Sequence, residues 1–215
     1  MKIEVNEQKP KNFKAYWDNQ YEVFSHFEFA CGIPSALFAI TTFKKNGKPN
    51  VCLHAWSTFQ GDGNAFYAIM TGIYKDSHTF ENINRTQEFC INFLSKDYYD
   101  GLINTIKNNN DEDDEFYAGG FTIEKATAVT SPRIKESFLC MECRLEKIIF
   151  LSAAAQTAMV IGKVRNIALE EEYAKGLDKK YGTDGFMYNV HAPINIKTGK
   201  GNTSAISTLN IERLL

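Results

Sequence analysis

The dipeptide Asn46-Gly47 constrains the fold of this chain more than any other feature of its sequence. It follows an apolar, threonine-containing run at residues 37–43 and precedes a second run from about residue 50 to residue 57. Asparagine and glycine both tolerate a positive φ angle, which a tight turn between antiparallel strands requires. We therefore predict a β-hairpin at this point of the chain.

Most of the remaining pattern is also typical of strands. Apolar or alternating side chains predict further strands at residues 65–70, 88–93, 138–151 and 156–168. Helices are predicted after a cap at Asp76 or Ser77, over residues 99–106, and over residues 170–180. The result is a mainly β fold with a few peripheral helices, which favours a small antiparallel barrel over a doubly wound α/β fold.

No feature of the sequence divides the chain into parts. Its 215 residues contain no internal repeat, low-complexity tract or Pro/Ser-rich linker, so we predict a single domain over residues 1–215. Residues 1–30 are expected to form an N-terminal extension that wraps the core, and residues 182–215 a C-terminal tail.

The charged residues nearly balance. Lys plus Arg number 24 and Asp plus Glu 26, so the net charge of −2 provides no positive field for nucleic acid or an anionic membrane. The apolar runs are far shorter than the roughly 20 residues of a membrane span. Residues 1–20 lack the apolar region of an export signal. Five cysteines are an odd number in a chain of this length, and we expect them to be reduced, in the cytoplasm.

Signatures of side-chain catalysis are missing. Cys140 and Cys143 fall in a predicted strand, where their thiols point to opposite faces, so we interpret them as buried rather than redox-active or zinc-binding. The acidic run 111–115 lacks the alternating ligands of a calcium loop and is interpreted as a solvated loop. Residues 61–66 begin like a dinucleotide fingerprint, but Phe66 and a following strand exclude it. We predict no catalytic side chain and no metal site.

Two segments have the chemistry of ligand sites. Residues 75–79 (Lys-Asp-Ser-His-Thr) stand at a predicted helix N-terminus, whose unpaired N–H groups and partial positive charge suit an anion such as phosphate. An ordinary capped helix start explains the same residues equally well. Residues 56–58 (Trp-Ser-Thr) end a predicted strand and could face a flat polar ring, although such residues are also common beside turns.

The order of these motifs along the chain is informative as a whole. Residues 47–51 (Gly-Lys-Pro-Asn-Val) and 55–58 are followed by the helix start at 77–83, then by strands at 88–92 and 160–164. In this order, over about residues 30–170, the chain resembles the flavin reductase-like family, whose FMN-binding split barrel is shared with flavoredoxins. The resemblance implies a split β-barrel of Greek-key antiparallel strands, assembled as a homodimer that binds FMN near the subunit interface.

The resemblance also implies a set of cofactor-binding residues. They are Asn50, Trp56, Ser57, Thr58, Lys75, Ser77, His78, Thr79 and Asn92. Residues 56–58 match the segment that lies along the isoalloxazine ring, and residues 75–79 match the segment that holds the phosphate. Many relatives carry Arg or Lys where this chain has His78. The extension or the tail is expected to cover the partner's flavin, with Tyr188 or His191 as contacts.

An anion site beside a polar strand end, without an acid–base pair or nucleophile, is typical of chemistry carried by a cofactor. We expect a reductase in which NAD(P)H delivers hydride to the flavin N5 and nearby amides and hydroxyls stabilise the reduced ring. Two alternatives are a flavoredoxin-like carrier, which keeps FMN bound and takes electrons from a redox partner protein, and a non-catalytic flavin-binding protein.

Overall fold

The computed structural model describes residues 1–191, 193–202 and 204–214. The chain forms two compact units. The main unit comprises Ala36–Met187 and Thr208–Leu215, and the terminal unit comprises Met1–Ser35 and Tyr188–Ser207. The segments expected to be an extension and a tail therefore contribute most of the terminal unit. That the whole chain is a single folding domain stays a prediction.

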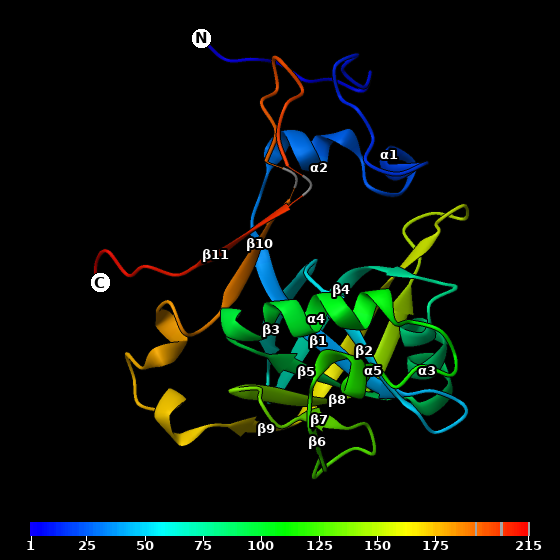
Figure 1. The fold of residues 1–215 in the computed structure, drawn as a ribbon, viewed down its shortest axis with the longest axis vertical. Coiled ribbons are helices and arrows are strands. Elements are labelled where there is room, and N and C mark those ends of the chain that lie inside the picture. Colours follow the sequence, from blue (N-terminus) through cyan, green and yellow to red (C-terminus); the bar gives the residue numbers. More distant parts are fainter. Residues whose placement is uncertain (192, 203, 215) are drawn as a thin grey trace. The chain divides into compact units, whose positions relative to one another are not determined.

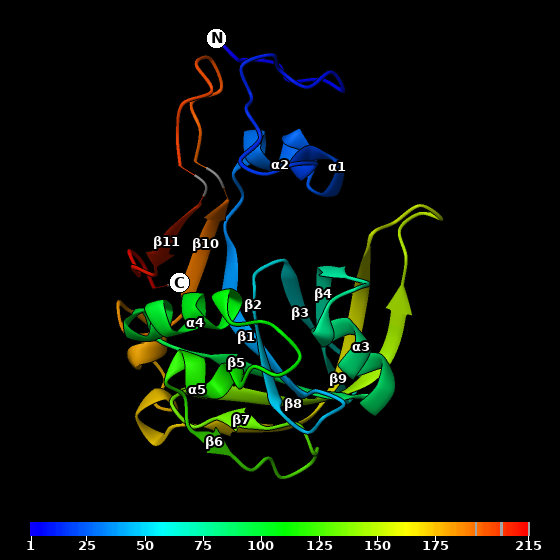
Figure 2. The same cartoon turned by 45° about the vertical axis from the view of Figure 1, so that its right-hand side comes forward.

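The main unit is built on one antiparallel sheet (Figure 1). Its strands are β1 (Ser35–Phe43), β2 (Pro49–His54), β3 (Ser57–Asp62), β4 (Ala65–Tyr74), β5 (Glu88–Phe93), β8 (Leu139–Ile149) and β9 (Thr157–Leu169). They pair in the order β2-β1-β5-β8-β9-β4-β3. The long β8–β9 hairpin extends beyond the neighbouring strands of this unit, as Figure 2 shows. The mainly β antiparallel fold predicted from the sequence is confirmed.

The predicted hairpin is present, with a different turn. β1 and β2 pair from Phe43–Pro49 to Phe38–His54. Gly47 has a φ of 85°, whereas Asn46 is not among the residues with positive φ. The Lys44 carbonyl accepts from Gly47 N, and Lys44 N donates to the Lys48 carbonyl at 2.8 Å. This is the three-residue loop that combines a type I turn with a left-handed glycine. The Asn46 side chain accepts from Lys48 N and stabilises it.

The sequence analysis did not predict β3 as a separate strand. The strand after the hairpin ends at His54, and β3 begins at Ser57 as a separate element. β3 pairs with β4 through a tight turn in which Gly63 has a φ of 56°. Residues 61–66, excluded above as a dinucleotide motif, are this turn and its flanks. Asn64 is the second residue of the turn, and β4 runs from Ala65 to Tyr74.

Two predicted helices are confirmed and one is wrong. α3 (His78–Thr86) begins after the cap Ser77, and α4 (Tyr99–Lys107) follows a short 3-10 turn, η1 (Lys96–Tyr98). The helix expected over 170–180 is replaced by two 3-10 turns, η2 (Glu171–Tyr173) and η3 (Lys179–Tyr181). Gly176 adopts a φ of 66° between them, which ends helical geometry there. A further helix, α5 (Glu115–Gly119), and the small sheet of β6 (Ile123–Glu124) and β7 (Arg133–Ile134) complete the main unit.

The core of the main unit lies between its curved strands. It is formed by buried side chains of β1, β4, β5, β8 and β9, among them Phe38, Met70, Phe89, Cys143 and Val160. Cys140 and Cys143 are both buried, as the sequence predicted. α4 packs against α5 and β2, so these helices cover the β2 end of the sheet (Figure 1).

The terminal unit joins the two ends of the chain. It contains α1 (Gln20–Val23), α2 (His26–Cys31) and most of β10 (Met187–His191) and β11 (Ser204–Thr208). Phe13 and Phe29 form its small core together with Ile194 and Ile196. Asn12 Nδ2 donates to the Ile196 carbonyl at 2.9 Å. None of the helices in the described part of the chain is long and apolar enough to cross a membrane.

Gly162 tests the packing of the main sheet. A Cβ at this position would lie 2.3 Å from Cζ of Phe89, whose ring is fully buried and has no space to move into. We expect Gly162→Ala to lower the free energy of unfolding by about 1–3 kcal/mol, the usual cost of overpacking. Urea denaturation measures it. The control is Gly61→Ala in β3, where the nearest atom would be the Ala65 carbonyl oxygen at 3.9 Å. Equal stability changes in the two variants would contradict this account.

Candidate functional site

A cavity of about 220 Å³ lies where β2, the first turn of α3 and the last turn of α4 meet. β2 contributes residues 50–53, α3 with its cap contributes residues 77–79, and α4 with the segment that follows it contributes Thr105, Ile106 and Asn109. The structure thus brings together Asn50, Ser77, His78 and Thr79, which the sequence analysis named as cofactor-binding residues.

Asn50 and Thr79 connect the strand to the helix. Both are 2% exposed, and Asn50 Nδ2 donates to Thr79 Oγ1 at 3.1 Å. This bond fixes the start of α3 against β2, because both side chains are too buried to exchange partners with bulk water. Cys52, further along the cavity wall, is a neutral thiol at physiological pH because burial raises its pKa to about 11.

Ser77 acts as the cap of α3. Its hydroxyl accepts from Phe80 N at 3.2 Å and donates to the Tyr74 carbonyl at 2.7 Å. The hydroxyl proton is therefore already used within the chain. The described residues provide no acceptor for the backbone N–H groups of His78 and Thr79. These are the orphan donors of a helix start, and they lie at the cavity.

His78 is held by the loop that follows α4. Its Nε2 lies 2.8 Å from Asp111 Oδ1, and its Nδ1 lies 3.1 Å from Asn109 Oδ1. The Asp111 side chain is 82% exposed, so it can leave this position at little cost. The solvent-exposed Asp111 carboxylate therefore occupies the place beside the imidazole that was predicted to help bind phosphate.

The acidic run 111–115 is only partly the solvated loop expected from the sequence. Glu115 is 1% exposed and forms an ion pair with Lys44 at 2.9 Å. Its second oxygen accepts from Val51 N at 2.6 Å, next to Asn50 on β2. Desolvation raises the pKa of Glu115, and the Lys44 ammonium and the Val51 amide oppose that rise. The sequence analysis missed this role because a run of carboxylates does not indicate which one is buried.

Lys75 and residues 56–58 lie outside the cavity wall. Lys75 is exposed, and its ammonium lies over the Phe150 ring, 5.6 Å from the centroid. Trp56 stands two residues after the end of β2 and directly before β3, and its carbonyl accepts from Thr71 N at 2.9 Å. Ser57 Oγ donates to the Ala55 carbonyl at 3.3 Å, and Thr58 is exposed. The segment 56–58 thus continues the chain from the cavity-lining strand but does not itself line the cavity.

Asn92 belongs to the core instead. It is fully buried, its Nδ2 donates to Thr41 Oγ1 at 2.9 Å and to the Ala39 carbonyl at 3.4 Å, and its Oδ1 accepts from Ile134 N at 2.9 Å. The amide thereby connects β5 to β1 and to β7. Its polar atoms are engaged inside the main unit and it does not line the cavity at α3, and its contact with a ligand stays a prediction. The sequence could not separate this role from binding, since both need an asparagine.

The cavity suits one end of FMN better than the whole molecule. Pockets that bury a small organic ligand usually measure roughly 300–1,000 Å³, which is more than the 220 Å³ found here. Its walls offer orphan N–H donors, the imidazole of His78 and the hydroxyl of Thr79, a donor set that fits a phosphate and a ribityl chain. A flavin ring would have to lie outside this cavity.

The comparisons with known proteins agree with this geometry. The family described as "Flavin reductase like domain" matches residues 30–185. Nitrilotriacetate monooxygenase component B from Bacillus cereus superimposes with a TM-score of 0.75 at 18% identity, covering 100% of this chain and 99% of that one. Flavoredoxin of Desulfovibrio vulgaris (Miyazaki F) gives 0.67 at 17% identity, covering 85% and 90%.

One further relative is a solved split-barrel structure, and another is similar in sequence. A split-barrel protein of Shewanella frigidimarina NCIMB 400, assigned provisionally to the flavin reductases, gives a TM-score of 0.72 at 22% identity and covers 91% and 92% of the two chains. An uncharacterized protein of Aquifex aeolicus (strain VF5) is 27% identical over 120 residues, 54% of this chain. The match spans 61% of that relative's length.

The chain belongs to the flavin reductase-like family, because the family match covers well over half of its length. The main unit is accordingly a split barrel, as its structural relatives show. Membership in this family makes the protein a flavin-related oxidoreductase.

His54, at the end of the cavity-lining strand, makes stability depend on pH. Burial lowers the pKa of His54 from 6.5 to about 4, and hydrogen bonds to the backbone only partly oppose this. The folded protein thus favours the neutral imidazole. The contribution of His54 to the free energy of unfolding is therefore complete above pH 6.5 and is lost as the pH falls towards 4. We expect this residue to lower the free energy of unfolding by about 2 kcal/mol between pH 7 and pH 5. Urea denaturation at several pH values should show a shallower loss in His54→Gln. Parallel profiles for the two proteins would refute this assignment.

Proposed function

We propose that the protein binds FMN and transfers hydride to it from NAD(P)H, as an NAD(P)H:flavin oxidoreductase. The observation that carries the proposal is the cavity at the start of α3, where orphan N–H groups, an imidazole and a buried Asn50–Thr79 pair meet. It is supported by the family match over residues 30–185. FMN, when bound, supplies the redox chemistry, since hydride acceptance belongs to the cofactor and not to the polypeptide.

The chain's own residues would bind and orient the cofactor. The N–H groups of His78 and Thr79 would donate to the phosphate, and the helix dipole of α3 would favour its charge. His78 would add a donor once Asp111 has left it. Asn50 keeps Thr79 in place. Trp56, Ser57 and Thr58, which continue from β2, would lie beside the ring, and we assign no side chain a proton-transfer role.

A homodimer is part of this proposal. The cavity accommodates only one end of FMN, and Thr58 is exposed in this chain, so a second copy would complete the enclosure of the ring. The β8–β9 hairpin carries Phe150 at 49% exposure and Leu151 at 76%, an apolar tip of the kind that interfaces cover.

The five cysteines form no disulfide, which agrees with a reducing compartment such as the cytoplasm.

Asp111 tests the position of the phosphate. If the phosphate binds at His78, the Asp111 carboxylate competes with it, and Asp111→Asn should tighten FMN binding roughly two- to fivefold. Fluorescence titration of FMN measures the dissociation constant. The control is Glu112→Gln, which removes the same charge one residue away, from a side chain that is 83% exposed and paired with Lys48. Weaker binding in Asp111→Asn, or equal changes in both variants, would place the phosphate elsewhere.

Hydride transfer is tested by anaerobic stopped-flow spectroscopy. Protein loaded with FMN is mixed with NADH or with NADPH, and we expect the flavin absorbance to bleach in a single turnover with at least one of them. Protein that binds FMN tightly but bleaches with neither donor would contradict the reductase. Reduction by a reduced ferredoxin instead would establish the flavoredoxin-like alternative, and reduction by none of them a flavin-binding protein without this activity.

A further inference from the structure

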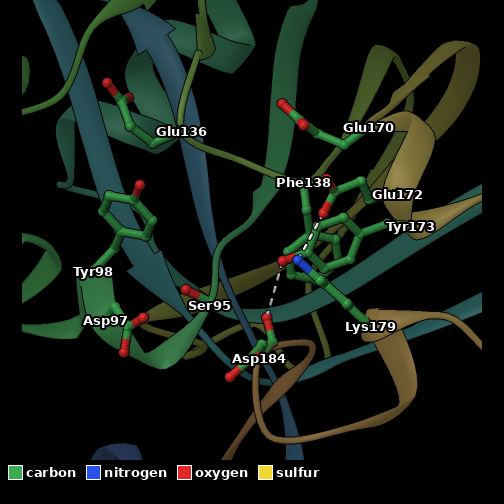
Figure 3. A pocket seen from close by; sticks show the side chains of 10 residues that line it. All are labelled: Ser95, Asp97, Tyr98, Glu136, Phe138, Glu170, Glu172, Tyr173, Lys179 and Asp184. Atoms are coloured by element: carbon green, nitrogen blue, oxygen red, sulfur yellow. Dashed lines mark hydrogen bonds and ion pairs between the residues drawn. The ribbon is translucent and has the colours of Figure 1, made fainter.

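A second cavity, of about 470 Å³, lies in the main unit between η1, the start of β8 and the segment from the end of β9 through η3. Its volume falls in the range of pockets that hold small organic ligands. None of the residues that line it lines the cavity at α3. It is therefore a separate candidate site within the same unit (Figure 3).

Carboxylates dominate the wall of this pocket. They belong to Asp97, Glu136, Glu170, Glu172 and Asp184, and Figure 3 shows them around the opening, from the η1 side to the η2 and η3 side. Lys179 is the one cationic side chain among the lining residues. Within the described part of the chain, the carboxylates of Asp97 and Glu170 have neither a hydrogen bond nor an ion pair. Glu172 pairs with Lys179 at 2.6 Å and Asp184 with Lys96 at 3.4 Å, so the uncompensated negative charge of the pocket is that of the remaining carboxylates.

The Lys179 ammonium shows how this pocket receives a cation. It lies 2.6 Å from Glu172 Oε2 and 5.9 Å from the centroid of the Tyr173 ring. Tyr173 stacks on Phe138, with centroids 4.7 Å apart and planes 10° apart. A carboxylate beside an aromatic face is a favourable place for an ammonium group. Lys179 already occupies the place beside Tyr173 and Glu172, so an external ammonium group would bind at the unpaired carboxylates.

Ser95 gives an independent indication of a ligand. It is 9% exposed, it lines the pocket, and its hydroxyl faces the side on which Asp97 and Tyr98 lie (Figure 3). It precedes η1 but makes no side-chain capping bond there. No hydrogen bond joins this hydroxyl to any of the described residues. A hydroxyl that is not used within the chain and opens into a pocket is available to a donor or acceptor from outside.

The arrangement selects the chemical class of the ligand. Among the described residues, no group of three His, Cys, Asp or Glu side chains is placed to hold a metal ion, so the carboxylates are too dispersed for one cation centre. Phosphates would be repelled, which excludes flavin and nicotinamide nucleotides here. A flexible chain with several ammonium groups can reach separated carboxylates and donate to the Ser95 hydroxyl as well.

We propose that this pocket binds a small aliphatic polyamine. One ammonium group pairs with Asp97, a second pairs with Glu170, and an N–H donates to Ser95 Oγ. This function is independent of the flavin site, and its failure would leave the proposed reductase activity untouched.

Isothermal titration of the full chain with spermidine tests the proposal. We expect one binding event per chain, and a roughly tenfold weaker one in the double variant Asp97→Asn/Glu170→Gln, since two ion pairs are lost. Both side chains are exposed, so the variant should fold, and circular dichroism verifies this. Ser95→Ala should weaken binding about two- to fivefold, because it removes a single acceptor.

The control variant is Glu146→Gln/Glu171→Gln, which removes the same charge from exposed side chains outside the pocket. It should retain wild-type affinity within about twofold, since screened charges at the surface contribute little. Absence of spermidine binding, an equal loss in the control variant, or full displacement by Mg²⁺ at equal ionic strength would each overturn the proposal, because they indicate non-specific charge attraction.

Discussion

The buried ion pair of Lys44 and Glu115 organises the part of the structure around the cavity at α3. Lys44 is 4% exposed, and its ammonium also donates to the carbonyls of Asn110 at 2.6 Å and Asp113 at 3.1 Å. Glu115 in turn accepts from Val51 N on β2. One pair therefore connects the end of β1, the neighbouring strand and the loop after α4. Removal of one partner would leave a buried charge without compensation, which is far more costly than loss of both.

This connection explains why an imidazole at a helix start is paired with an acidic loop. The loop that Lys44 holds carries Asn109 and Asp111, whose side-chain oxygens contact the two nitrogens of His78. The imidazole of His78 thus has the carboxylate of Asp111 as its partner within the chain. An anion that binds at this site would therefore replace the Asp111 carboxylate beside His78, so that one negative group takes the place of another. Such an exchange costs less than the burial of an isolated charge, because the imidazole has a partner in either state.

The sequence was sufficient wherever a local pattern determined the structure. The Asn46-Gly47 hairpin, the Ser77 cap and the α4 stripe depend on residues close in the chain, and each was predicted correctly. Errors arose where the outcome depended on distant partners. The sequence does not show that Glu115, unlike its acidic neighbours, is buried against Lys44, nor that Thr41 and Ile134 use the amide of Asn92. The helix expected over 170–180 failed because Gly176 takes a left-handed conformation that local propensity did not reveal.

The composition of the terminal unit limits how this protein can diverge. Phe13 and Phe29 come from one end of the chain and Ile194 and Ile196 from the other, yet the four side chains share one small apolar core. A deletion at either end would expose the apolar surface contributed by the other. In related genes the two segments should accordingly be inherited as a pair or be missing as a pair.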